Sequence, residues 1–171
     1  MKKALLIIDL QNDYFSGGKF PLWNTDKTLE NVVKAIEKAN SKGIPAIHIQ
    51  HIADPKAGIA PFFNEGTEGA NIHPEVLKAA PNGKIVIKHY ADGFYETNLE
   101  EVLSELGVEE LLICGMMTQN CVTHTAISKS AEKYKVKILP DCCTTVNEAI
   151  HMIGLHAVST RVEFANFEDA I

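Results

Sequence analysis

Residues 111–124 read LLICGMMTQNCVTH, and this stretch bears on both the fold and the chemistry of the chain. The run from Leu111 to Cys114 is apolar, which is typical of a strand buried in the middle of a sheet. A turn through Gly115 then leads to Cys121, which we expect in the first turn of a helix. The unpaired N–H groups and the positive dipole end of a helix start favour a thiolate over a thiol. Cys121 is therefore the best nucleophile candidate in the sequence.

Similar apolar runs recur along the chain and alternate with stretches of helical periodicity. The predicted strands cover residues 4–8, 44–49, 85–87, 111–114, 136–139 and 162–164. The predicted helices lie at residues 29–36, 99–106 and 147–157, with a further one carrying Cys121. Strands rich in Ile, Val and Leu without polar alternation are buried on both faces and are typical of a parallel sheet between helices. We therefore predict an α/β fold in a single domain over residues 1–171, a length that allows a sizeable core.

The composition narrows the possible partners. The formal net charge of −6 comes without a concentrated basic stripe, so we expect neither nucleic acid nor a membrane as a partner. Met1-Lys-Lys is followed by only five apolar residues before Asp9, too few for a signal-peptide core. No apolar run approaches the roughly 18 residues of a membrane span. We therefore expect a cytoplasmic protein. We also expect reduced cysteines, because their spacing contains no CxxC pair.

Three reactive side chains are predicted to meet at one edge of the sheet. In open parallel sheets, ligands bind outside the carboxyl ends of the strands, where the strand order reverses. Asp9 closes the first predicted strand, Lys88 closes the third, and the fourth leads to Cys121. Each residue alone has a plain structural explanation, but their equivalent positions favour a shared site.

Four motifs are spread over nearly the whole chain. They are ALLIIDLQNDYF at 4–15, EGTEG at 65–69, KHYADGFYETNL at 88–99 and CGMMTQNCV at 114–122. With these motifs the sequence resembles the isochorismatase-like cysteine hydrolase superfamily, which includes nicotinamidases and N-carbamoylsarcosine amidases. The resemblance implies a three-layer α/β/α Rossmann-like fold with a six-stranded, mainly parallel sheet. It also implies a homodimer or homotetramer.

The same resemblance implies the residues of the active site. They are a catalytic triad of Asp9, Lys88 and Cys121, and a cis peptide bond between Met116 and Met117. The backbone N–H groups of Met117 and Cys121 would form an oxyanion hole, in which one donor contributes about 2.7 to 4 kcal/mol. The glycines of EGTEG at 65–69 do not form a GxGxxG phosphate loop, so we expect no cofactor.

The chemistry of the triad follows from its residue types. Asp9 would accept the thiol proton, Lys88 would orient Asp9 and attract the thiolate, and the sulfur would attack a carbonyl carbon. Loss of the amine leaves a thioester, which water activated by Asp9 hydrolyses. The resting charge of Cys121 stays open, because a nearby carboxylate raises a thiol pKa and a nearby ammonium lowers it.

The resemblance to nicotinamidases raises the question of a metal site. Those enzymes build one from an Asp-x-His element after the second strand and a later histidine, but residues 48–54 here read HIQHIAD. On a strand His48 and His51 are three apart and point to opposite faces, so they cannot chelate one ion together. We therefore expect no bound metal. A dyad of Cys121 and His124 is an alternative arrangement, because residues three apart share a helix face.

Substrate specificity is expected to reside in the loops near residues 52–72 and 89–97. Aromatic side chains from loops that follow strand ends are candidates for the pocket wall, because they offer a large apolar contact area. The predicted pocket residues are Phe15, Trp23, Gln50, His51 and Phe94.

Together these features predict a metal-independent amidohydrolase that acts on a small carboxamide, carbamoyl or ureido compound through a cysteine thioester. One enzymatic alternative is a nicotinamidase-like activity with an unrecognised metal site. Another is isochorismatase-like ether hydrolysis, which does not use a nucleophilic cysteine at position 121. A thiol redox sensor or a ligand-binding domain is the non-enzymatic alternative. It predicts peroxide-sensitive sulfenylation of Cys121 without amide turnover.

Overall fold

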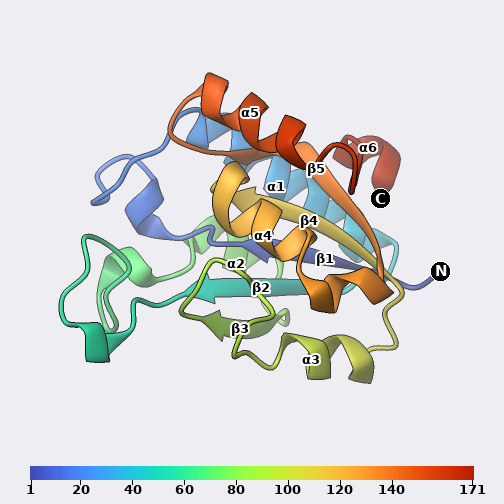
Figure 1. Ribbon diagram of the computed structural model, residues 1–171, viewed down its shortest axis with the longest axis horizontal. Coiled ribbons are helices and arrows are strands. Elements are labelled where there is room, and N and C mark those ends of the chain that lie inside the picture. Colours follow the sequence, from blue (N-terminus) through green and yellow to red (C-terminus); the bar gives the residue numbers. More distant parts are fainter.

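Six parallel strands form one sheet at the centre of the computed structural model, which describes residues 1–171 (Figure 1). The strands are β1 (Lys3–Ile8), β2 (Ala46–His51), β3 (Lys84–Lys88), β4 (Glu110–Met116), β5 (Lys135–Thr144) and β6 (Glu163–Phe164). Their order in the sheet is β3-β2-β1-β4-β5-β6, and every neighbouring pair is parallel. The prediction of an α/β fold with a six-stranded sheet is confirmed.

Helices cover both faces of the sheet and produce three layers (Figure 1). The α-helices are α1 (Thr25–Ser41), α2 (Pro74–Ala79), α3 (Leu99–Glu105), α4 (Thr123–Ala126), α5 (Glu148–Val158) and α6 (Phe167–Ala170). Short 3₁₀ helices lie at Asn12–Tyr14, Pro55–Ala57, Glu68–Ala70 and Lys129–Lys133, and a π-helical turn covers Thr118–Val122. α1 packs with α2 and α6 on one face, and α4 and α5 pack on β5 from the other. None of these helices combines the length and the apolar character needed to cross a bilayer.

α1 shows how the apolar pattern becomes a helix. Leu29, Val32 and Ile36 recur at helical spacing, and all three are buried. The helix ends at Ser41, and Gly43 follows with a positive φ of 69° that glycine adopts without strain. α2 and α6 were not predicted, because six and four residues give too few turns for a periodic pattern.

β3 differs from the sequence prediction because only one of its faces is buried. Val86 and Lys88 are fully buried, whereas Ile85 and Ile87 are each 50% exposed. β3 lies at the edge of the sheet and pairs with β2 alone. Alternate residues of a strand point to opposite faces, so one uncovered face gives this period of two. The prediction that the strands are buried on both faces is wrong for β3, and also for β6 at the opposite edge, whose two residues are exposed.

Gly115 allows a close approach of β1 and β4 at the point where the strand order reverses. The chain runs from β1 outward to β3 and then crosses to β4, on the other side of β1. Gly115 has a φ of 124°, and a Cβ atom there would lie 2.0 Å from the Ile8 carbonyl oxygen. Only glycine fits such a contact. Asp9 therefore leaves β1 directly beside the end of β4, from which the chain continues to Cys121.

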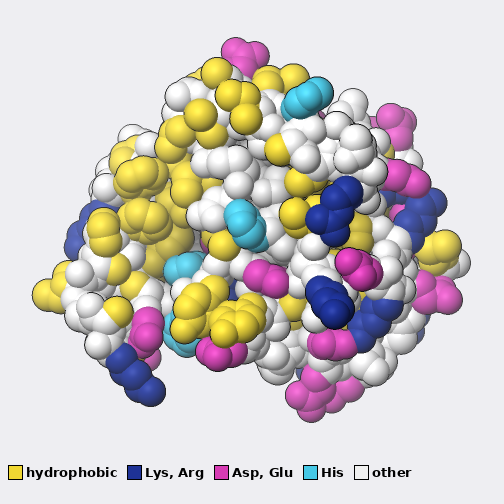
Figure 2. All heavy atoms as spheres, viewed as in Figure 1, with side chains coloured by type: hydrophobic (Ala, Val, Ile, Leu, Met, Phe, Trp, Pro, Cys, Tyr) yellow, Lys and Arg dark blue, Asp and Glu magenta, His cyan; other side chains and the backbone are white.

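The face of the molecule shown in Figure 2 carries charges of both signs, intermixed and without a continuous basic stripe. Hydrophobic side chains gather on the left of this view, where Figure 1 places the segment before α1 and the start of α5. Exposed residues here include Phe20 and Trp23 before α1, Val146 just before α5 and Ile153 within α5. The strands point toward the same side in Figure 1, so apolar surface borders the carboxyl ends of the sheet.

Candidate active site

Asp9 is the first residue after β1, and it is fully buried. It has a positive φ of 55°, a conformation that Asp tolerates better than most residues. Its backbone N–H donates to the Ile49 carbonyl oxygen at 2.9 Å. The backbone of Asp9 is therefore anchored at the switch point of the sheet by a hydrogen bond to the neighbouring strand β2.

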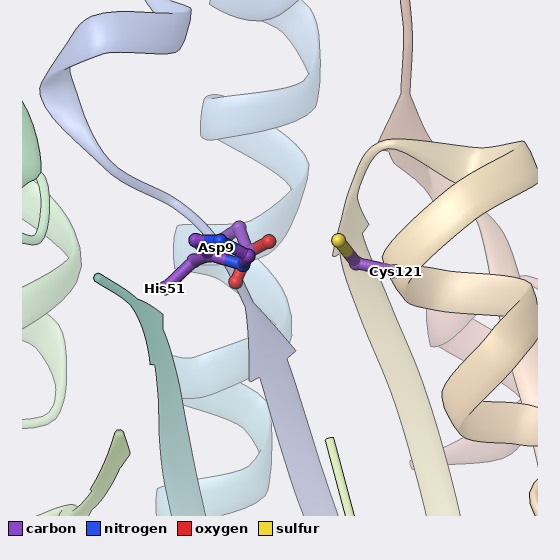
Figure 3. Close-up of side chains that lie close together, drawn as sticks. All are labelled: Asp9, His51 and Cys121. Atoms are coloured by element: carbon purple, nitrogen blue, oxygen red, sulfur yellow. The ribbon is translucent and has the colours of Figure 1, made fainter. Parts of the chain in front are cut away.

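Cys121 lies in the π-helical turn Thr118–Val122, which runs directly into α4. The prediction that Cys121 lies in the first turn of a helix is confirmed, and that turn is π-helical. β4 continues to Met116, so the wider turn begins after only one intervening residue. The side chain of Cys121 is 3% exposed, and its sulfur points across the end of the sheet toward Asp9 and His51 (Figure 3). The donor atoms of these three residues lie within 4.8 Å of one another.

Lys88, the last residue of β3, adds a positive charge to this group. Its Nζ lies 3.1 Å from Asp9 Oδ2 and 3.2 Å from Cys121 Sγ. It also lies 2.8 Å from His51 Nδ1 and 3.0 Å from the Tyr90 carbonyl oxygen. A fully buried ammonium needs such partners, because an unpaired charge in the interior is costly. The side chains of Asp9, Lys88 and Cys121 thus meet in one polar cluster.

The protonation states of the cluster follow from burial and from these charges. Burial raises the pKa of the Cys121 thiol, Asp9 raises it further and Lys88 lowers it, which results in a pKa of about 12. Burial lowers the pKa of Lys88, but Asp9 and Cys121 outweigh burial, so the pKa of Lys88 is raised. At neutral pH the site therefore holds a thiol and an ammonium. The sequence left the resting charge of Cys121 open; burial and Asp9 outweigh Lys88 and keep the thiol protonated.

His51 ends β2 and lies opposite Lys88 in the register of β2 and β3. Burial, and after it the charge of Lys88, lowers the pKa of the imidazole to about 4. The ring is thus neutral at physiological pH. It accepts the Lys88 hydrogen bond at Nδ1, which places its own proton on Nε2. Among the predicted pocket residues, His51 is the one that bonds to Lys88.

The other four predicted pocket residues interact with groups outside the triad. Phe15 packs on His73, Trp23 lies near His151, Gln50 donates to the Ala70 carbonyl oxygen, and Phe94 stacks on Tyr134. Phe15 and Phe94 are buried, whereas Trp23 is 36% exposed. Their part in substrate binding stays a prediction.

The backbone before Cys121 has two notable features. The peptide bond between Met116 and Met117 is cis. Met117 lies between β4 and the π-helical turn, and its N–H donates no hydrogen bond within the chain. An unpaired N–H close to the nucleophile is the donor that an oxyanion hole requires. That the N–H groups of Met117 and Cys121 bind an oxyanion stays a prediction.

Gln11 supports the site, although sequence reasoning did not single it out. It is fully buried, and its Nε2 donates to the carbonyl oxygens of His51 and Ala70, both at 2.7 Å. Its Oε1 accepts from the His51 N–H at 2.8 Å. Gln11 thus holds the end of β2 through both backbone hydrogen-bonding groups of His51. Its place two residues after Asp9 was the signal available in the sequence.

Tyr14 is a second residue that sequence reasoning missed. It is 2% exposed, and burial raises the pKa of its hydroxyl, with further increases from Asp9 and Cys121. The hydroxyl is therefore neutral and within electrostatic reach of both groups.

His124 and His48 have partners outside the cluster. The Nδ1 of His124 donates to the Asn120 carbonyl oxygen at 2.8 Å, and the side chain is exposed, so it forms no dyad with Cys121. His48 is buried, and its Nε2 donates to the Ala80 carbonyl oxygen at 3.0 Å. The two histidines of β2 therefore have separate surroundings.

Asp9, His51 and Cys121 each offer a donor atom of a kind that Zn²⁺ accepts. The Lys88 ammonium, however, lies within 3.2 Å of a donor atom of each. A divalent cation at the same point would be repelled by this charge. These residues therefore do not fit a metal ion while Lys88 is in place.

The chain matches known proteins over nearly its whole length. The family model described as "Isochorismatase domain" matches residues 3–167. The chain belongs to the isochorismatase family. The resemblance inferred from the sequence motifs is thereby confirmed, and the chain is an isochorismatase-family hydrolase.

Relatives and solved structures agree with this assignment of the isochorismatase-family hydrolase. The uncharacterized isochorismatase family protein YddQ of Bacillus subtilis is 39% identical over 145 residues, which cover 85% of this chain and 79% of YddQ. The nicotinamidase of Escherichia coli is 26% identical over 179 residues, with 85% and 84% covered. The crystal structure of an isochorismatase hydrolase from Oleispira antarctica is 33% identical, covers 99% of this chain and 95% of its own, and superposes with a TM-score of 0.86.

Proposed function

We propose that this isochorismatase-family hydrolase is a metal-independent cysteine amidohydrolase. Its substrate is a small carboxamide, carbamoyl or ureido compound, whose C–N bond is cleaved through a thioester on Cys121. The observation that carries the proposal is the Lys88 ammonium, which lies within 3.2 Å of both the Cys121 sulfur and the Asp9 carboxylate. These groups supply the nucleophile, the base and the charge that acyl transfer needs. The relation to a nicotinamidase supports this substrate class.

The first half of the reaction forms the thioester. The thiol proton moves from Cys121 to Asp9, whose Oδ1 is buried and has no hydrogen-bond partner within the chain. Lys88 stabilises the negative sulfur while it attacks the carbonyl carbon. The N–H groups of Met117 and Cys121 bind the oxyanion that results. Asp9 then gives its proton to the departing nitrogen, the C–N bond breaks, and ammonia or an amine leaves.

The second half of the reaction hydrolyses the thioester. Asp9, again a carboxylate, accepts a proton from water as the water oxygen attacks the acyl carbon. The same backbone N–H groups bind the second oxyanion. The C–S bond breaks, the sulfur leaves beside the Lys88 ammonium and recovers its proton from Asp9, and the acid product departs. The chain is thereby returned to its resting thiol.

An ammonia-release screen tests the proposal. Carboxamides including nicotinamide, N-carbamoyl compounds and ureas are offered to the wild-type chain, to Cys121→Ala and to Cys143→Ala. Cys143→Ala is the matched control, because it removes a buried thiol that bonds within its own strand. We expect release by wild type and by Cys143→Ala, none by Cys121→Ala, and a trapped acyl adduct on the Cys121 peptide in mass spectrometry.

Two results would overturn the proposal. Release by Cys121→Ala at the wild-type rate would remove the covalent mechanism and favour hydrolysis without a cysteine nucleophile. No release from any compound, together with sulfenylation of Cys121 by dilute peroxide, would favour a thiol redox sensor.

A further inference from the structure

Lys88 has four polar atoms around its ammonium, one in an ion pair and three as hydrogen-bond partners, and two of the four change during the proposed reaction. The four are Asp9 Oδ2, Cys121 Sγ, His51 Nδ1 and the Tyr90 carbonyl oxygen. Asp9 loses its charge when it takes the thiol proton. The Cys121 sulfur becomes part of a thioester, which is a weak acceptor. At these stages only His51 and the Tyr90 carbonyl oxygen hold the ammonium unchanged.

Of these two constant acceptors, His51 is the one that ties Lys88 to another strand. Tyr90 lies only two residues beyond Lys88, so its carbonyl oxygen belongs to the same segment. His51 lies across from Lys88 in the pairing of β2 and β3, and the contact of 2.8 Å is the shortest of the four. His51 therefore holds the ammonium, which comes from the edge strand β3, against the next strand inward, β2.

His51 is itself fixed on several sides. Its backbone N–H and carbonyl oxygen both bond to the buried amide of Gln11, at 2.8 and 2.7 Å. Its ring centroid lies 5.8 Å from that of the buried Phe63. In Figure 3 the imidazole extends from the end of β2 to Asp9, whose carboxylate lies between the ring and Cys121 in this view. A ring held in this way can impose a position on Lys88.

The imidazole is also neutral, as it must be to accept a hydrogen bond from the Lys88 ammonium. The charged and titratable groups around it are Asp9, Lys88, His89 and Cys121. Burial and the Lys88 charge keep the imidazole neutral, with a pKa of about 4, so the Nδ1 lone pair is available at working pH. A protonated ring would have two donors and no acceptor for the ammonium.

We propose that His51 is a positioning residue that holds the Lys88 ammonium against Cys121 and Asp9 throughout the catalytic cycle. It acts through Nδ1 as an acceptor whose capacity does not change when Asp9 is protonated or Cys121 is acylated. The assignment rests on the proposed function and adds to it the group that keeps the cation in place.

Three substitutions at position 51 separate the acceptor from the ring. His51→Asn places an amide oxygen near the position of Nδ1, His51→Gln moves the amide farther along the side chain, and His51→Phe keeps the ring without an acceptor. The first readout is the rate of Cys121 alkylation by iodoacetamide as a function of pH, measured on the Cys121 peptide. The second is kcat and KM with a substrate from the ammonia-release screen.

We expect His51→Phe to move the alkylation profile of Cys121 to higher pH by about one unit, which is about tenfold less thiolate at a given pH. The value of kcat should fall by a similar factor with little change in KM, because the ammonium acts on the reacting sulfur. His51→Asn should restore most of both values, and His51→Gln should not. If His51→Phe fails to fold, the alkylation profiles and kcat values of His51→Asn and His51→Gln test the assignment instead.

An alkylation profile of His51→Phe that matches wild type would overturn the assignment, as would a His51→Asn variant no better than His51→Gln. The alkylation experiment needs no substrate. If no amide is turned over but the profiles shift as expected, the proposed hydrolase activity fails while the link between His51 and Lys88 stands.

Discussion

Cys121 and Cys143 are both buried thiols with a pKa raised to about 12, and burial is the main cause in each. Their surroundings differ. The Cys143 sulfur donates to the Leu139 carbonyl oxygen at 3.2 Å, within β5. The Cys121 sulfur instead lies beside the Lys88 ammonium, at the end of the sheet where Asp9 is placed. A high thiol pKa therefore does not identify a nucleophile, whereas a base and a cation at the sulfur do.

Asp9→Asn should produce the largest effect at Cys121. The amide keeps the shape of the side chain but cannot accept the thiol proton, so we expect turnover to fall by about 10² or more. The alkylation profile of Cys121 should move to lower pH, because the group that raises its pKa electrostatically is removed. Ammonia release and iodoacetamide kinetics measure the two effects. A turnover rate close to that of wild type would assign the base to another residue.

Lys88→Met should shift the same profile in the opposite direction. Lys88 is the group that lowers the Cys121 pKa, so its loss raises that pKa above about 12 and makes alkylation at a fixed pH slower, by about tenfold per unit. The buried Asp9 carboxylate also loses its partner, which we expect to lower the free energy of unfolding by about 3 to 5 kcal/mol. Urea unfolding monitors this second effect. An unchanged alkylation profile would contradict the electrostatic role of Lys88.

Cys143→Ala should produce the smallest effect. It removes the buried thiol with which Cys121 is compared. Removing its sulfur deletes one weak hydrogen bond and leaves a small void, so we expect a loss of about 1 kcal/mol in the free energy of unfolding. Turnover should stay at the wild-type level, because no charged side chain bonds to this sulfur. A large loss of turnover in a folded Cys143→Ala protein would remove the distinction between the two thiols.

The positions of Asp9, Lys88 and Cys121 could be predicted because parallel sheets bring the carboxyl ends of their strands to one side. The apolar runs located all six strands, and polar residues at their ends then stood out. The subunit number has no comparable signal in a single chain.

Other features depend on contacts that a local pattern does not contain. Residues 85–87 read as a central strand, but the order of strands places β3 at the edge and exposes Ile85 and Ile87. The bond between His51 and Lys88 depends on the pairing of β2 with β3, and the predicted second strand stopped at Ile49, short of His51. The thiol state of Cys121 depends on its burial and on the Asp9 charge, which together outweigh the charge of Lys88.

The place of Lys88 on an outer strand has a consequence for how the proposed activity is lost on heating. β3 is joined to the sheet through β2 alone, so its hydrogen bonds can open while the pairing among the inner strands stays intact. Such local opening requires less free energy than global unfolding. The position of the Lys88 ammonium therefore depends on an edge strand with a low free energy of local opening. Asp9, in contrast, follows a strand that is paired on both sides. Local opening of β3 would be enough to abolish the proposed activity while most of the protein stays folded.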